Sequence, residues 1–329
     1  MSHEALWFSR QDDGKVRCEL CPHRCVIAPG SAGRCRVRRN EDGTLVAASY
    51  GRTVSVAVDP VEKKPLYHFL PGQPVVSVGH NSCNLACAFC QNHSISQSDC
   101  PSAELPVEKL VEVCRQQRSP MVAFTYTEPV TWFEYILDAA RTLHAAGVRT
   151  IMVSNGYINP EPLEQLIPHI DAWNIDLKGM DDEFYRKLCG ASLEPVLETI
   201  RRVAGRCWLE LTNLVVTGEN DSVDATDRLI DFVAGVDPCI PVHFSRYFPQ
   251  YKLTAPPTPE STLLDIYRRA CEKLAYVYLG NMRTSGESDT LCPECGSRMI
   301  ARDGYSVRFD RMAAGVCLDC GRPIEGVWR

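Results

Sequence analysis

Three cysteines, Cys83, Cys87 and Cys90, lie within eight residues in the stretch CNLACAFC. Thiolates are the ligands of iron–sulfur clusters, and a [4Fe–4S] cube has four irons to be held. Three cysteines would bind three irons and leave the fourth open to a reactant, as a catalytic zinc keeps one position free. We therefore predict a catalytic [4Fe–4S] cluster at these three residues. A structural or purely electron-transferring cluster would need a fourth ligand close by, and Cys100 is the candidate within reach.

Two further cysteine sets have the spacing of metal ligands. The first is a pair of CxxC motifs, each followed by glycine, and consists of Cys292, Cys295, Cys317 and Cys320. This two-knuckle pattern predicts a structural zinc ribbon, with a nucleic-acid-binding ribbon as the alternative. The second set consists of Cys18, Cys21, Cys25 and Cys35. Four thiolates there fit zinc, and they also fit an auxiliary [4Fe–4S] cluster that relays electrons.

The six remaining cysteines are scattered along the chain. They are Cys100, Cys114, Cys189, Cys207, Cys239 and Cys271. We predict that they are buried free thiols, because cysteine without a partner behaves as a small apolar residue.

The segments that must position these residues repeat one sequence pattern: a short apolar run, a polar break and a stretch of helical periodicity. The predicted strands are Val75–Gly79, Met121–Tyr126, Arg149–Ser154, Ala172–Leu177, Trp208–Val216 and Val242–Ser245, with a seventh candidate at Ala275–Leu279. The predicted helices are Glu128–Ala146, Glu161–Ile170, Leu193–Ala204, Ala225–Ala234 and Pro259–Leu274. This alternation predicts an α/β fold with parallel strands, in an open sheet or in a full or partial (β/α) barrel.

Polar side chains gather at one end of the predicted strands. The three-cysteine stretch follows Val75–Gly79, so it would be a loop at the end where parallel α/β folds place their chemistry. The other strand ends carry Glu128, Asn155, Asp176, Lys178 and His243. Taken singly, these residues also have structural interpretations: a helix cap for the glutamate, an ion pair for the aspartate and lysine, and a core position for the histidine. Together with the cysteine loop, they predict one mouth of a barrel.

These motifs resemble those of a known family. CxxxCxxC in this place resembles the radical S-adenosylmethionine (radical SAM) superfamily, and the whole pattern looks like its pyruvate formate-lyase-activating-enzyme branch. Over nearly the whole chain it resembles the AmmeMemoRadiSam system radical SAM enzymes. The matching stretches are CELCPHRC, DPVEKKPLYHFLPG, CQNHSISQ, FTYTEP, SNGYI, DLKG and the terminal CxxC pairs. Activating enzymes commonly have two glycines before the glutamate of FTYTEP, whereas this chain has Tyr126 and Thr127.

The resemblance implies a fold and a cofactor site. The fold would be a partial (β/α)6 TIM-like barrel with small N-terminal and C-terminal cysteine-rich modules that bind metal. Glu128 would bind the methionine amino group of S-adenosyl-L-methionine, and Phe89 would flank its adenine. The residues implied to contact the rest of this cofactor are Asn155, Asp176, Lys178 and His243.

The implied activity is radical chemistry. A reduced cluster would cleave S-adenosylmethionine to methionine and a 5′-deoxyadenosyl radical, which would take a hydrogen atom from a substrate. The likeness to glycyl-radical-enzyme activases suggests an oxidoreductase with a protein substrate, and a small-molecule substrate stays open. A reductant such as flavodoxin or ferredoxin would be a partner. The alternative is an iron–sulfur electron carrier with structural zinc modules, which would have no affinity for S-adenosylmethionine.

Composition shifts divide the chain into four predicted parts. These are a four-cysteine module at 1–50, a connecting segment at 51–74, the barrel at 75–283 and a zinc-ribbon-like module at 284–329. The connecting segment contains Asp59–Gly72, whose charged residues fit either a solvated loop or a wall of the substrate site.

Bulk properties narrow the class of protein. The 329 residues carry a formal net charge of -6, which argues against a nucleic-acid partner. No apolar run approaches the ~18 residues of a membrane span and the start does not resemble a signal peptide, so we expect a soluble protein without a membrane partner. The 17 cysteines include metal-ligand spacings, which indicates a reducing, cytoplasmic compartment.

The first 40 residues depart from this acidic balance. They include Arg34, Arg36, Arg38 and Arg39. We interpret them either as a solvated basic face or as a docking site for an electron donor or acidic partner.

Overall fold

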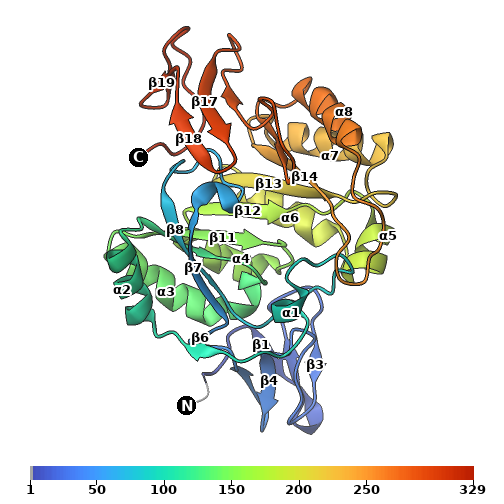
Figure 1. Cartoon of the computed structure of the whole chain (residues 1–329). Coiled ribbons are helices and arrows are strands. Elements are labelled where there is room, and N and C mark those ends of the chain that lie inside the picture. Colours follow the sequence, from blue (N-terminus) through green and yellow to red (C-terminus); the bar gives the residue numbers. More distant parts are fainter. Residues whose placement is uncertain (1–2) are drawn as a thin grey trace.

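The computed structural model describes residues 3–329, and its centre is one sheet of eight strands in the order β15-β14-β13-β12-β11-β10-β8-β7 (Figure 1). Seven of these strands are parallel: β8 Pro74–Gly79, β10 Met121–Phe124, β11 Arg149–Ser154, β12 Ala172–Asp176, β13 Trp208–Val215, β14 Val242–Arg246 and β15 Val277–Gly280. Within the described residues the edge strands β7 and β15 do not pair with each other, so the sheet is a partial barrel. The predicted fold class and strands are confirmed. The eighth strand, β7 (Ser55–Pro60), is antiparallel to β8 and was not predicted.

Helices cover the outer face of this sheet. Their bounds are α1 His93–Ser96, α2 Val107–Gln117, α3 Phe133–Ala145, α4 Pro160–Leu166, α5 Asp182–Phe184, α6 Glu194–Val203, α7 Val223–Val236 and α8 Glu260–Cys271. The longer helices are amphipathic and bury their apolar side against the sheet; α3, for example, buries Phe133, Ile136 and Leu143 completely. The predicted helices are present, most with shorter bounds, whereas α7 extends beyond the predicted Ala225–Ala234 at both ends. Helix α2 was not predicted. Short helical turns cover Pro129–Trp132 and Tyr185–Cys189.

The inner face of the sheet is filled by the connecting segment. Val61, Leu66 and Phe69 are buried in one apolar cluster with inward-facing strand residues such as Val75 and Met121. The expectation of a solvated loop is therefore wrong for most of this stretch. Its charged and polar members Asp59, Lys64 and His68 are also buried. Because the segment supplies the inner apolar core, it closes the interior that seven strands alone would leave open.

The N-terminal cysteine-rich module lies at the end of the molecule near α1 (Figure 1). Its strands are β1 Phe8–Arg10, β2 Val16–Cys18, β3 Val26–Ile27, β4 Arg38–Glu41 and β5 Thr44–Ala47, followed by β6 Arg52–Thr53, which pairs with β9 Ala103–Glu104. A buried ion pair fastens it to the barrel: Arg38 Nη1 lies 2.9 Å from Glu134 Oε1 on α3. The interpretation of Arg38 as part of a solvated basic face is therefore wrong, because its guanidinium is 2% exposed.

The C-terminal module lies at the opposite end (Figure 1). It contains β16 Thr290–Leu291, β17 Arg298–Asp303, β18 Ser306–Phe309, β19 Met312–Ala313 and β20 Val316–Cys317. The Sγ atoms of its four predicted zinc ligands all lie within 4.8 Å of one another. Arg302 joins the module to the connecting segment, since its Nη2 donates to the Tyr67 carbonyl at 2.7 Å and its guanidinium lies 4.1 Å from the centre of the Tyr67 ring.

All 17 cysteines lie in the described part of the chain and are free thiols. Of the six scattered ones, Cys114 and Cys189 are buried as predicted, but Cys271 is exposed and the prediction of burial is wrong there. Among the helices of residues 3–329, none combines the length and the apolar character that crossing a bilayer requires.

Candidate active site

The three-cysteine loop is held at the carboxyl end of β8 by contacts that reach across the molecule. The Asn84 carbonyl lies 2.8 Å from His23 Nε2, and the Asn84 side chain donates to the Tyr157 carbonyl at 2.8 Å. Ser82 Oγ donates to the Cys35 carbonyl at 2.8 Å. The loop is thus fixed on one side by the N-terminal module and on the other by the residues that follow β11. Such support holds three thiols in position before any cofactor binds.

The spacing of the three sulfurs fits a cluster better than a single ion. Among residues 3–329, the C-terminal set is the one group in which three or more ligand atoms all lie within 4.8 Å of one another. The sulfurs of Cys83, Cys87 and Cys90 are therefore spread more widely than one metal ion requires. Wide spacing is expected when each thiolate binds a different iron of a cube. The residues present fit a three-cysteine [4Fe–4S] site.

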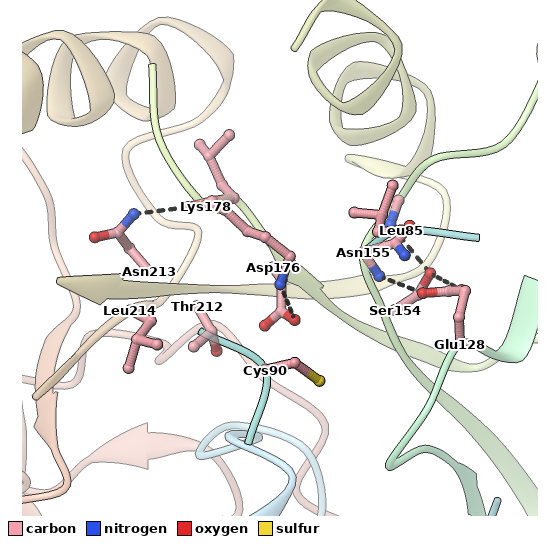
Figure 2. A network of polar contacts seen from close by, with 12 residues as sticks. Leu85, Cys90, Glu128, Ser154, Asn155, Asp176, Lys178, Thr212, Asn213 and Leu214 are labelled. Carbon is pink, nitrogen blue, oxygen red and sulfur yellow. Dashed lines mark hydrogen bonds and ion pairs between the residues drawn. The ribbon is translucent and has the colours of Figure 1, made fainter. Parts of the chain in front are cut away.

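A carboxylate lies beside this loop at the ends of β10 and β11. Glu128 accepts hydrogen bonds from Val130 N at 2.9 Å, Ser154 Oγ at 2.7 Å and Asn155 N at 2.8 Å (Figure 2). It caps the turn at Pro129–Trp132, as the structural interpretation expected. Burial raises the pKa of Glu128 to about 7, although these three donors oppose the shift. A carboxylate accepts about four hydrogen bonds, so one acceptor position remains for a ligand.

Asn155 connects this carboxylate to the cysteine loop. Its side-chain nitrogen lies 3.8 Å from Cys83 Sγ and donates to Asn84 Oδ1 at 2.9 Å. The backbone N–H of the same residue binds Glu128. The structure thus brings two of the predicted cofactor contacts and one predicted cluster ligand together.

The next strand end carries an ion pair. Lys178 Nζ lies 2.9 Å from Asp176 Oδ2, and both side chains lie above Cys90 in Figure 2. Burial alone would lower the pKa of Lys178, but the negative charge of Asp176 and of nearby thiolates holds it well above its usual range. Lysine and aspartate together present both signs of charge, which suits a zwitterionic amino acid that also bears a sulfonium.

Cys189, one of the six scattered cysteines, lies near the predicted cluster ligand Cys87. It ends the turn Tyr185–Cys189, whose carbonyls at Leu188 and Cys189 accept from the loop residues Ala88 and Ala86 at 2.8 and 2.9 Å. Its thiol is near enough to Cys87 to lower the pKa of that residue. Cys83, Cys87 and Cys90 share one loop and Cys189 lies outside it, so the prediction of three cluster ligands is kept. We therefore assign Cys189 to support of Cys87.

Phe89 and His243 occupy different surroundings. Phe89 is buried against Phe184, with ring centres 5.9 Å apart, on the side of the loop that faces α5. His243 Nε2 lies 2.7 Å from Glu210 Oε2, and its ring packs edge-on against Tyr67 with ring centres 4.6 Å apart. The structure thus places His243 with the connecting segment, and its contact with the cofactor stays a prediction.

Tyr126, where the family resemblance implies a glycine, has a backbone conformation that glycine favours. Its φ is 69°, in the left-handed region that bulky residues rarely adopt. Its hydroxyl donates to Asp59 Oδ2 at 2.6 Å, and Lys64 Nζ lies 2.7 Å from the same oxygen. Burial would raise the pKa of Asp59, but hydrogen bonds from Lys63, Lys64 and Tyr126 hold it well below its usual range. Sequence patterns missed this contact because it joins two segments 67 residues apart.

Comparisons with known proteins agree with this geometry. The profile of the radical SAM superfamily matches residues 78–230. An uncharacterised protein of Methanocaldococcus jannaschii is 41% identical over 331 residues, which cover 98% of each chain. Pyruvate formate-lyase 1-activating enzyme of Escherichia coli is 27% identical over 161 residues, 46% of this chain and 64% of that one.

Two solved structures share the fold. SuiB of Streptococcus suis, in its complex with S-adenosylmethionine, aligns over 68% of this chain and 53% of its own with a TM-score of 0.52 and 14% identity. A radical SAM methyltransferase from Sphaerobacter thermophilus aligns over 70% and 71% with a TM-score of 0.51 and 17% identity.

Proposed function

Since the chain belongs to the radical SAM superfamily, we propose that it is an oxidoreductase that cleaves S-adenosylmethionine reductively at a [4Fe–4S] cluster held by Cys83, Cys87 and Cys90. The observation that carries the proposal is three thiols with wide spacing beside three charged groups, Glu128, Asp176 and Lys178, at the mouth of a partial barrel. When bound, the cluster and S-adenosylmethionine together supply the electron transfer that generates a 5′-deoxyadenosyl radical.

The chain's own residues bind and orient the cofactor. Glu128 would accept from the methionine ammonium at its remaining acceptor position, and Asn155 would hold the neighbouring side of the loop. Lys178 and Asp176 would contact the methionine carboxylate and the ribose side of S-adenosylmethionine. Phe89 would flank the adenine and exclude water from it, and Cys189 would keep Cys87 in its orientation by hydrogen bonding.

The likeness to activases supports a further part of this proposal, namely that the substrate is a protein. Pyruvate formate-lyase 1-activating enzyme and 4-hydroxyphenylacetate decarboxylase activating enzyme are both among the similar proteins, although each aligns with less than half of this chain. A one-electron reductant such as flavodoxin or ferredoxin would be the second partner. We further propose a structural zinc at the C-terminal cysteine set and a cytoplasmic location, which 17 free thiols favour.

Product analysis tests the proposal directly. The full chain is reconstituted with iron and sulfide without oxygen, reduced with dithionite and incubated with S-adenosylmethionine. We expect 5′-deoxyadenosine and methionine in equal amounts, since one bond cleavage yields both. An intact cluster that gives neither product would contradict the proposal and would favour an electron carrier.

The affinity for S-adenosylmethionine should depend on the ionisation of Glu128. Because the pKa of this buried carboxyl is about 7, its charged fraction rises from about 10% at pH 6 to about 90% at pH 8. We expect the dissociation constant to fall by up to about tenfold over this range, since the carboxylate attracts the ammonium only when it is ionised. Titration calorimetry of the reconstituted, unreduced protein measures it.

Glu128→Gln should bind more weakly and lose this pH dependence, whereas Glu164→Gln, a change at an exposed carboxylate, should keep it. An equal pH dependence in all three proteins would remove Glu128 from the binding site.

A further inference from the structure

The four N-terminal cysteines surround a cavity between the N-terminal module and the barrel. Its lining contains all four, Cys18, Cys21, Cys25 and Cys35, together with Asn84 and Thr131 from the barrel. The space between these side chains is about 330 Å³, its part open to solvent included. Its enclosed part is about 20 Å³, room for about one water, so the choice of metal rests on the positions of the sulfurs.

The distances between the sulfurs separate the two metals that four thiolates could hold. Tetrahedral zinc with Zn–S bonds of ~2.3 Å places its sulfurs about 3.8 Å apart. The C-terminal set shows that geometry in this same chain, with 3.6 Å between Cys292 and Cys320 and between Cys295 and Cys317. In the described chain, the N-terminal set does not bring even three sulfurs within 4.8 Å of one another. Neither this set nor the active-site set therefore has the close spacing of the ribbon cysteines.

The sequence spacing agrees with this distinction. Zinc ribbons pair two CxxC knuckles, as the C-terminal module does, whereas Cys18, Cys21 and Cys25 form one CxxCxxxC run with Cys35 far along the chain. A run of three cysteines on one loop spreads its sulfurs over different corners of a larger group.

The lining also suits a negatively charged group. Arg38 borders the cavity, and its Nε is buried without a hydrogen-bond partner in the described structure. The backbone N–H of Arg34 lies 3.5 Å from Cys25 Sγ, a contact of the kind that stabilises cluster thiolates.

From these observations we propose that Cys18, Cys21, Cys25 and Cys35 bind a second [4Fe–4S] cluster and not a zinc ion. Asn84, which lines its cavity, directly follows the active-site ligand Cys83, and Ser82 on the other side of that ligand binds the Cys35 carbonyl. The second cluster would therefore adjoin the active-site loop. An electron from a one-electron reductant could pass through it to the active site without a large movement of the chain.

Counting metals tests this assignment independently of the reaction. The full chain is reconstituted with iron, sulfide and zinc together, and its metals are measured after gel filtration. We expect about eight iron atoms and about one zinc per chain, since each [4Fe–4S] cluster holds four irons and the ribbon holds one zinc. About four irons and about two zincs would overturn the proposal.

Two variants show which site holds which metal. The triple variant Cys83→Ala, Cys87→Ala, Cys90→Ala should keep about four irons and the electron paramagnetic resonance signal of a reduced cluster, and iron-free protein with about two zincs would overturn the proposal. As the matched control, Cys295→Ser, Cys320→Ser should lose zinc and keep all of its iron. If the triple variant does not fold, Mössbauer spectra of the unaltered protein decide, because two cluster environments support a second cluster and one environment overturns it.

Discussion

Replacing Cys83, Cys87 or Cys90 with alanine is expected to reduce 5′-deoxyadenosine formation to the background of the assay. Each replacement removes the sole protein ligand of one iron, so the cube loses a corner and its open iron is no longer held in place. Loss of an outer contact to a metal ligand typically costs ~10–100-fold in activity, and loss of a ligand itself should cost at least about 1000-fold. Liquid chromatography of the quenched anaerobic reaction measures the product.

Cys189→Ala is the matched control for these three variants. It removes a buried thiol from the same surroundings, but we assign that thiol to support of Cys87 and not to iron. We expect the variant to keep the iron of the active-site cluster and to lose at most about 100-fold in activity, the upper range for outer contacts. Loss of this cluster in Cys189→Ala would show that a fourth thiol binds it, and the open iron on which the proposed function depends would not exist.

Local sequence patterns predicted the parts of the site that are contiguous in the chain. The cysteine loop is one eight-residue stretch, and the parallel strands are apolar on both faces because helices cover one face and the connecting segment covers the other. Glu128, Asn155 and Asp176 lie at or shortly after the ends of such strands, so their shared mouth could be inferred from the alternation alone. The burial and spacing of these residues agree with that inference.

The contacts that patterns could not predict join distant segments. Asp59–Gly72 resembles a charged loop because nothing within it shows that Asp59 meets Tyr126 or that Arg302 reaches Tyr67. Cys189 was missed for the same reason, since its distance from Cys87 along the chain conceals their contact. One signal was available: Glu210 is the one charged residue of β13, and a charged residue must find partners when its strand is buried.

Glu210 is the residue whose loss should destabilise the protein most. Its carboxylate is fully buried and accepts from Tyr67 N at 2.9 Å, His68 N at 2.8 Å, Trp208 Nε1 at 3.0 Å and His243 Nε2 at 2.7 Å. Glu210→Ala leaves three buried donors and the half-buried Trp208 Nε1 without an acceptor, and each buried one costs ~1–3 kcal/mol, so we expect a loss of at least about 3 kcal/mol. Whole domains are stable by only ~5–15 kcal/mol, which makes this loss severe. Urea unfolding followed by circular dichroism measures it.

The Glu210 variants should also rank in a defined order of stability, and the loss of Glu210 should unfold one segment of the chain before the others. Glu210→Gln keeps one acceptor oxygen and should be intermediate, whereas Glu164→Ala, which breaks exposed ion pairs, should change the free energy of unfolding by less than about 0.5 kcal/mol. Because Glu210 holds the backbone of Tyr67 and His68, its loss should expose the connecting segment to limited proteolysis before the barrel helices are cut. A Glu210→Ala protein as stable and as protease-resistant as Glu164→Ala would mean that the segment is held in the barrel by its apolar side chains alone.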